Sequence, residues 1–292
     1  MDSDKLLGEF LRARREVTTP AQVGLPHVGF RRTPGLRREE VATLAGVSTD
    51  YYIRLEQGRE RHPSDQVLVA LTRVLDLGSE AAAHLYELAR PRPRRGGTTG
   101  LRERVSPDLL RLMRSWTDTP ALVCDRWMNV LAANPLAAAL YGGLEHADNL
   151  IRLIFLDPAA REFYPNWEQA ARARAAHLRA VVGADLGNPY LTELVDELSF
   201  KSVDFCRMWA RHDVSGMTSE TKHFYHREVG ALTLTCELFN VNSTPGQQLI
   251  TIQAKPASPS ERALALLGNR VAMTHKTVER PETLMERTRD GG

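Results

Sequence analysis

The chain has 292 residues, in which 38 lysines and arginines nearly balance 36 aspartates and glutamates, for a formal net charge of +2. This balance excludes binding to nucleic acid through bulk positive charge, so any such affinity must come from the placement of basic residues. The three cysteines, Cys124, Cys206 and Cys236, are dispersed and without a CxxC spacing, which favours neither a disulfide framework nor a zinc site and fits a reducing compartment. No apolar run is long enough to span a bilayer, the first residues lack the apolar segment of a signal peptide, and the length favours two domains.

Residues 1–90 predict an all-α domain of five helices. Leu6, Leu7, Phe10 and Leu11 have the spacing of an amphipathic first helix. Two helices are predicted within Gly35–Ser64. Ser64 is placed to cap the fourth helix, which Gly78 closes, and Ser79 to cap the fifth. The apolar residues of these last two helices are Val67, Leu68, Leu71, Val74, Leu75, Ala82, Leu85, Tyr86 and Leu88.

The segment Gly35–Ser64, GLRREEVATLAGVSTDYYIRLEQGRERHPS, carries the clearest motif. Its first helix opens near Leu36. Gly46 follows as a residue that tolerates the left-handed backbone of a helix end, and Ser48 is placed to cap the next helix. Gly58 ends that second helix. Two short helices around a tight turn are typical of a helix-turn-helix that reads DNA.

The second motif helix has two distinct faces. Tyr52 and Leu55 share the inward face. The other face presents Thr49, Asp50, Ile53 and Arg54 to a binding partner. An arginine pairs bidentately with guanine O6 and N7, and an aspartate accepts from cytosine N4. Each residue has another interpretation. The helix macrodipole favours a carboxylate at Asp50 whether or not DNA is bound, and Arg54, four residues later, could simply form an exposed i, i+4 ion pair with Asp50.

Lys5 to Arg90 resembles the repressor-like helix-turn-helix domains of the Xre class, and GLRREEVATLAGVSTDYYIRLEQGR resembles the MmyB-like regulators of actinobacteria. The resemblance implies that Arg38 braces against the DNA backbone and that Thr49, Asp50 and Arg54 read bases. It also implies phosphate contacts in the loop that follows. The candidate DNA-binding residues are therefore Arg38, Ser48, Thr49, Asp50, Tyr51, Arg54, Arg59 and Arg61, with Tyr51 also interpretable as a packing residue.

Two segments have alternative interpretations. Glu16–Pro34, which contains Arg31 and Arg32, is either an arm that touches DNA or a surface loop with solvated charge. Residues 91–104 are rich in arginine, proline and glycine and predict an extended linker, which alternatively lies along phosphates.

The predicted second domain covers residues 105–270 and is mixed. A helix around 107–117 precedes a strand at Ala121–Cys124, a turn at Asp125 and Arg126, and a strand at Trp127–Ala132. Asn134 is placed to cap a short helix that begins at Pro135. This order resembles the opening of a PAS domain.

Further along, Gly230–Val241 alternates threonine and leucine as a half-buried strand does, and Gln248–Ala254 is its predicted antiparallel partner. Between these strands and the opening hairpin, about 167–209 is mostly helical. The predicted fold class is therefore α+β: a five-helix domain, then a PAS-like domain with a small antiparallel sheet and several helices. Residues 271–292 predict a disordered tail.

The MmyB-like resemblance extends through WARHDV (Trp209–Val214), Lys222, His226 and SPSERALALL, with Arg227 where the family usually has proline. It implies a ligand-binding domain with a small, apolar, fatty-acid-like effector, and no other cofactor. Candidate ligand-binding residues are Trp127, Phe155, Trp167, Trp209 and His212, for which the alternative is plain core packing.

No catalytic motif stands out. The adjacent His212 and Asp213 look like a base and its orienting carboxylate, but neighbours in a chain rarely face one another. His223 and His226 have a spacing that suits a metal only on a helix. We therefore expect no enzyme and no metal.

The leading hypothesis is a cytoplasmic, nucleoid-associated bacterial regulator, a homodimer on a palindromic double-stranded DNA operator, with no membrane partner. The alternatives make the second domain a protein-interaction platform or an enzyme.

Overall fold

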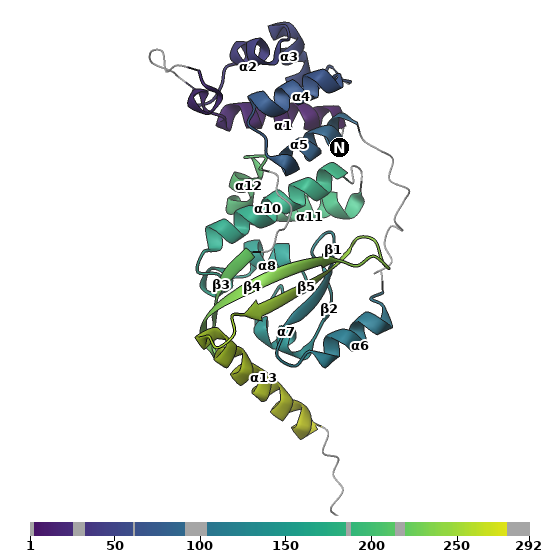
Figure 1. Cartoon of the computed structure of the whole chain (residues 1–292), viewed down its shortest axis with the longest axis vertical. Helices are drawn as coiled ribbons and strands as arrows, with labels where there is room; N and C mark the ends of the chain where they lie inside the picture. The colour runs from purple at the N-terminus through teal and green to yellow at the C-terminus, as the bar shows by residue number, and fades with distance from the viewer. Residues whose placement is uncertain are drawn as a thin grey trace, which may run out of the picture. The chain divides into compact units, whose positions relative to one another are not determined.

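The computed structural model describes residues 3–25, 33–60, 62–90, 104–184, 188–213 and 220–278. These residues form helices and a five-stranded antiparallel sheet, so the α+β prediction is confirmed (Figure 1). The chain packs as two compact units: one from Met1–Leu101, Ile151–Asp157 and Trp167–Met217, the other from Arg102–Leu150, Pro158–Asn166 and Thr218–Gly292. None of the described helices combines the length and apolar character needed to cross a membrane.

The N-terminal part of the first unit has the five predicted helices. They are α1 (Ser3–Val17), α2 (Arg38–Ala45), α3 (Thr49–Glu56), α4 (Asp65–Val74) and α5 (Ser79–Ala89), with a 3-10 turn, η1 (Pro20–Val23), after α1. Their apolar stripes meet in one core, whose fully buried members are Leu11, Leu36, Val41, Tyr52, Leu55, Leu68, Leu71, Leu75 and Leu85. Burial of this shared stripe is the main force that assembles helices this short.

The capping predictions are mostly confirmed. The Ser48 hydroxyl accepts from the Tyr51 N–H at 3.1 Å, and Gly46 has φ 69° at the end of α2. Two details of the prediction are wrong. α2 begins at Arg38 rather than near Leu36, because the Glu40 carboxylate accepts from the Arg37 N–H and fixes the helix start there. α5 already includes Ser79, so this serine does not cap it.

Further helices complete the first unit: most of α8 (Leu150–Leu156), with α10 (Trp167–Ala184), α11 (Pro189–Lys201) and α12 (Val203–Trp209). The last three confirm the helical stretch predicted from 167 to 209. α10 packs against α5 of the five-helix group and against α12.

The second unit is built on one sheet with the strand order β2-β1-β5-β4-β3 (Figure 1). Its strands are β1 (Ala121–Asp125), β2 (Val130–Ala133), β3 (Glu220–His226), β4 (Gly230–Asn240) and β5 (Gln247–Ala254). The predicted antiparallel pair of β4 and β5 is confirmed, with Leu238 opposite Ile250. Leu232 and Leu234 are buried while Thr233 is exposed, as the alternation predicted.

The turn between β1 and β2 is longer than predicted. The Asp125 carboxylate accepts from the N–H groups of Trp127 and Asn129 at 2.8 and 2.9 Å, and Met128 adopts φ 63°. Trp127 therefore lies in the turn, and the strand predicted from Trp127 begins at Val130. Asn134 caps α7 (Pro135–Leu140) as predicted, accepting from the Ala137 N–H at 2.9 Å.

Helices α6 (Pro107–Ser115), α9 (Ala160–Phe163) and α13 (Pro259–Val278) complete the second unit. β3 was not predicted as a strand; it is an edge strand that pairs with β4 across a short turn, with His226 opposite Gly230. α13 continues to Val278, within the segment predicted as a tail. The rest of that tail and residues 91–103 of the predicted linker lie outside the described residues.

A glycine sets the distance between α1 and α3. A Cβ on Gly8 would lie 2.4 Å from the Glu56 carbonyl oxygen and 2.9 Å from that of Leu55. Both atoms are backbone, so no side-chain rotation relieves the contact. α1 therefore approaches the C-terminal end of α3 as closely as it does only because position 8 has no side chain.

We expect Gly8→Ala to destabilise the five-helix group by about 1–3 kcal/mol, although alanine is the better helix former, because the two backbones must separate. Urea unfolding followed by circular dichroism measures the loss, and hydrogen exchange of α1 and α3 assigns it. Gly268→Ala in α13 is the matched control: its Cβ would meet only ordinary contacts, the nearest at 3.5 Å, so we expect no loss. Equal effects of the two substitutions would contradict the close approach.

Candidate nucleic-acid interface and effector site

The predicted recognition helix, α3, presents the polar face that the sequence assigned to it. Asp50 and Arg54 are exposed and Thr49 is half-buried, while Tyr52 and Leu55 are fully buried on the opposite side. Ser48 is exposed at the helix N-terminus, where its hydroxyl is already engaged as the cap. The structure thus brings Ser48, Thr49, Asp50, Tyr51 and Arg54 together on one helix.

Arg54 is held only loosely. Its Nε lies 3.9 Å from a Glu60 carboxylate oxygen, and its guanidinium carbon lies 5.9 Å from the centroid of the Tyr51 ring. The i, i+4 partner considered from the sequence was Asp50, but the ion pair that forms is with Glu60. A long, exposed pair of this kind contributes about 0–1 kcal/mol, so a DNA base or phosphate competes with it easily.

The ring of Tyr51 packs against the five-helix core, which agrees with the packing interpretation of this residue. Burial and then the charge of Glu60 raise the pKa of Tyr51, so its hydroxyl stays protonated and able to donate at neutral pH.

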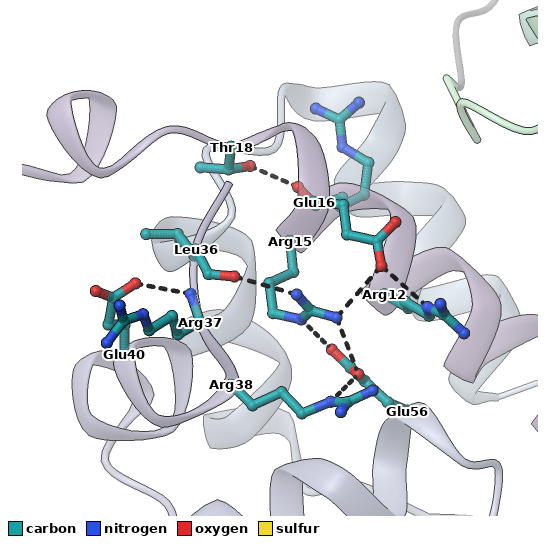
Figure 2. A network of polar contacts seen from close by, with 10 residues as sticks. Arg12, Arg15, Glu16, Thr18, Leu36, Arg37, Arg38, Glu40 and Glu56 are labelled. Atoms are coloured by element: carbon teal, nitrogen blue, oxygen red, sulfur yellow. Dashed lines mark hydrogen bonds and ion pairs between the residues drawn. The ribbon is translucent and has the colours of Figure 1, made fainter. Parts of the chain in front are cut away.

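Arg38 lies in an ion-pair network that the sequence did not reveal. Its Nε donates to one Glu56 carboxylate oxygen at 2.7 Å, and the Arg15 Nε donates to the other at 2.5 Å (Figure 2). Arg15 also donates to the Leu36 carbonyl oxygen at 3.1 Å. The Glu56 side chain is only 1% exposed, and it joins α1, α2 and α3.

The electrostatics of this network follow from burial. Burial alone would lower the pKa of Arg15, but the hydrogen bond and charge of Glu56 raise it above its usual value. The guanidinium therefore stays charged and neutralises the buried carboxylate. Glu56 lies on the inward face, four residues after the buried Tyr52, and this position is the sequence signal from which a cation partner could have been predicted.

The remaining DNA candidates lie after α3 or outside the described residues. Arg59 is exposed, directly after the end of α3. Arg61, and Arg31 and Arg32 of the predicted arm, lie outside the described residues.

Four of the five effector candidates lie in the first unit, and three of these form an aromatic row with Phe205. Ring centroids are 6.4 Å apart from Trp167 to Phe155, 5.1 Å from Phe155 to Phe205, and 5.3 Å from Phe205 to Trp209. The row ends at a cation, because the Arg179 guanidinium carbon lies 3.5 Å from the centroid of the Trp209 ring.

His212, the fourth candidate, lies just after α12 and near the same cation. Burial, then the charges of Arg179 and His84, lower the pKa of His212 to about 3. Burial and the charge of Arg179 likewise lower the pKa of His84 to about 4. Both imidazoles are therefore neutral at physiological pH, beside a buried arginine.

Trp127, the fifth candidate, lies in the second unit, where the Arg126 guanidinium carbon is 5.6 Å from its ring centroid. That unit has its own aromatic cluster, which the sequence analysis missed: Tyr141, Phe163, Tyr164 and Phe224. Phe224 of β3 contacts Phe163 and Tyr164, which lie far from it in the sequence, so no local pattern signalled the cluster.

The histidine motifs do not form a catalytic or metal constellation. The Asp213 carboxylate is 3.3 Å from Arg14 and 3.0 Å from Arg211, so it pairs with arginines. His223 and His226 lie on a strand, where i and i+3 point to opposite faces. Within the part of the chain that the structure describes, no group of three or more metal-ligating side chains gathers.

Comparison with known families gives two matches. Residues 6–85 match a family described as a helix-turn-helix domain. Residues 105–267, more than half of the chain, match the family described as the MmyB-like transcription regulator ligand binding domain. Neither description is that of an enzyme. No curated protein matches the chain significantly.

We expect Glu56→Gln to lower the free energy of unfolding of the five-helix group by about 3–5 kcal/mol, because it leaves the buried Arg15 cation without its counter-ion. The measurement is urea unfolding at neutral pH. Glu39→Gln in α2 is the matched control: the Glu39 pair with Arg37 is exposed on both sides, so its loss should be about 0–1 kcal/mol. Similar losses in the two variants would show that the buried network does not hold the helices together.

Proposed function

The chain belongs to the family of MmyB-like transcription regulators. On this premise we propose that it binds one palindromic operator through α3, and that a small apolar effector changes its affinity for this operator. The observation that carries the proposal is the presence of a helix-turn-helix domain and a ligand-binding domain in one chain.

In this proposal the exposed face of α3 enters the major groove. Arg54 pairs with a guanine, Asp50 accepts from a cytosine, and Thr49 contacts a neighbouring base. Ser48 and Tyr51 at the start of the helix, with Arg59 and Arg61 after it, contact phosphates. The loose pairing of Arg54 supports the assignment, because the side chain reorients at little cost.

Arg38 has a more indirect role in the same proposal. Its side chain is 43% exposed while it holds Glu56, so the guanidinium has donors left for a phosphate oxygen. The buried carboxylate then fixes this arginine in place, and the DNA backbone meets a preorganised cation.

For the effector we propose a fatty-acid-like molecule that contacts the aromatic row at Phe155 and Trp209, with Trp167 and His212 close by. The size and continuity of this aromatic surface support an apolar ligand. The order of hairpin, Asn134 cap and short helix supports the PAS-like assignment of the second unit.

We also propose a homodimer in the bacterial cytoplasm, at the nucleoid, where its operator lies. Two recognition helices then read half-sites about 34 Å apart, or a multiple of this distance. The effector changes DNA affinity only if it binds one dimer geometry more tightly than another.

Arg54→Ala should weaken binding to an operator selected from random DNA by about 1–3 kcal/mol and relax the preference at one base pair, because one bidentate base contact is lost. Arg59→Ala should instead weaken binding to all sequences and flatten the salt slope by about one unit. Fluorescence anisotropy measures both. Arg12→Ala, another exposed helical arginine with one weak ion pair, is the control and should bind as the wild type does. Unchanged specificity in Arg54→Ala would contradict the proposed register of α3.

Native mass spectrometry of the purified full chain should show a bound small molecule that organic solvent extracts. Trp209→Leu should lower its retention because the aromatic row is shortened, and Phe239→Leu, at an exposed aromatic residue of the other unit, should not. Adding the extracted molecule back should change operator affinity. A bare polypeptide mass, together with operator affinity that no apolar extract changes, would favour a protein-interaction platform instead.

A further inference from the structure

Arg179 is a buried cation for which the described part of the chain provides no counter-ion. The side chain lies on α10 and is 5% exposed. One of its terminal nitrogens donates to the Trp209 carbonyl oxygen at 2.5 Å, and its buried Nε has no hydrogen-bond partner. Among the described residues no carboxylate lies within ion-pair distance of it; the charge of Glu9 in α1 acts on it from farther away.

Two imidazoles, those of His84 and His212, lie close enough to this cation for its charge to lower their pKa values. His84 of α5 is 3% exposed, and its buried Nδ1 has no hydrogen-bond partner. Its ring packs edge-on against Phe10, at 5.2 Å between centroids. His212 approaches from the segment after α12: its backbone N–H donates at 3.2 Å to the Trp209 carbonyl oxygen, the same atom that accepts from Arg179.

The acidic residue next to His212 does not supply the missing charge. Asp213 pairs with Arg14 and Arg211, and the Nε of Arg14 is itself buried without a partner. α1, α5, α10 and the end of α12 thus contribute cations and neutral donors, with Glu9 as the one distant acid.

A buried guanidinium without an anion is costly, and folded proteins normally pair such a group and satisfy its N–H donors. The planar fork of an arginine matches a carboxylate or a phosphate, with two parallel hydrogen bonds. We propose that Arg179, His84 and His212 form a binding site for a small oxyanion, a carboxylate or phosphate group, held between α5, α10 and the residues after α12.

Occupation of this site has a consequence for the helix-turn-helix domain. His84 belongs to its last helix, whereas Arg179 belongs to the segment matched by the ligand-binding family. An anion bound by both side chains stabilises the packing of α5 on α10. The site therefore couples anion binding to the position of the DNA-binding helices relative to α10.

The anion has two sources with the same chemistry. One is a free ion such as phosphate. The other is the head group of the effector, since the aromatic row ends at Trp209 against Arg179; this second source rests on the proposed function.

Isothermal titration calorimetry on the full chain, with inorganic phosphate, acetate and dodecanoate at an ionic strength matched with chloride, tests the site. At least one oxyanion should bind saturably, and Arg179→Met should weaken that binding about ten- to a hundredfold, because charge-assisted hydrogen bonds are lost. Arg172→Met is the matched control. It is the same change on the same helix at an exposed arginine paired with Glu168, and it should bind as the wild type does.

A second variant covers the case in which Arg179→Met fails to fold. His84→Phe keeps an aromatic ring against Phe10 but removes the Nδ1 donor, and it should weaken oxyanion binding several-fold. In the wild type, affinity should also rise as pH falls from 7 to 5, because a bound anion favours protonated His84 and His212. This rise should shrink in His84→Phe.

If dodecanoate binds more tightly than acetate, and Arg179→Met weakens the binding of both, the anion is the head group of the effector. If Arg179→Met weakens the binding of phosphate or acetate but leaves the binding of dodecanoate unchanged, the site takes a free anion and the effector binds elsewhere. Absence of saturable oxyanion binding, or equal losses in Arg179→Met and Arg172→Met, overturns the site. A copurifying apolar molecule found alongside that negative result leaves the proposed function intact.

Discussion

The carboxylate of Glu56 is the charge on which the DNA-binding part of the molecule depends. It ends the recognition helix, lies inside the core, and is neutralised by Arg15 of α1 and Arg38 of α2. Removing a carboxylate from water is unfavourable unless its partners stay in place, so the three helices are held in one arrangement. The angle at which α3 presents its outer face follows from that arrangement, since a helix of eight residues has little stability of its own.

The close approach of α1 to its neighbours makes this network possible. Gly8 lets α1 reach the carbonyl groups at the end of α3, and Gly35 lies where a Cβ would meet the carbonyl oxygens of Arg15 and Glu16. The Leu36 N–H then donates to the Arg15 carbonyl oxygen at 3.0 Å, while the Arg15 side chain donates back to that of Leu36. Steric fit and charge pairing therefore act on the same few residues, and neither is satisfied without the other.

Local chemistry was predictable from the sequence and distant pairing was not. The Ser48 cap and the Asn134 cap depend on residues within one helical turn, and the spacing of apolar and capping residues signals them directly. The Glu56 network joins positions 41 residues apart, so no short pattern encodes it. Of the candidate site residues, the outer face of α3 could be predicted because one helix carries it, whereas Arg179 and His84 meet only through the packing of α5 on α10.

The exposed arginines of the DNA-binding face and the buried Arg179 differ in how much an anion stabilises them. Arg54 and Arg59 are exposed, so water stabilises them; in the proposed complex a phosphate or a base replaces that water, and the affinity then depends on salt. Arg179 is removed from water, and among the described residues it contacts the carbonyl oxygen and ring of Trp209 but no carboxylate within ion-pair distance, so an anion there relieves an energetic penalty already present in the folded chain. A ligand alters DNA affinity only through a difference in its binding free energy between two states. The packing of α5 on α10 is the element that a buried anion stabilises, and through α5 such a difference reaches the helices that carry Arg54.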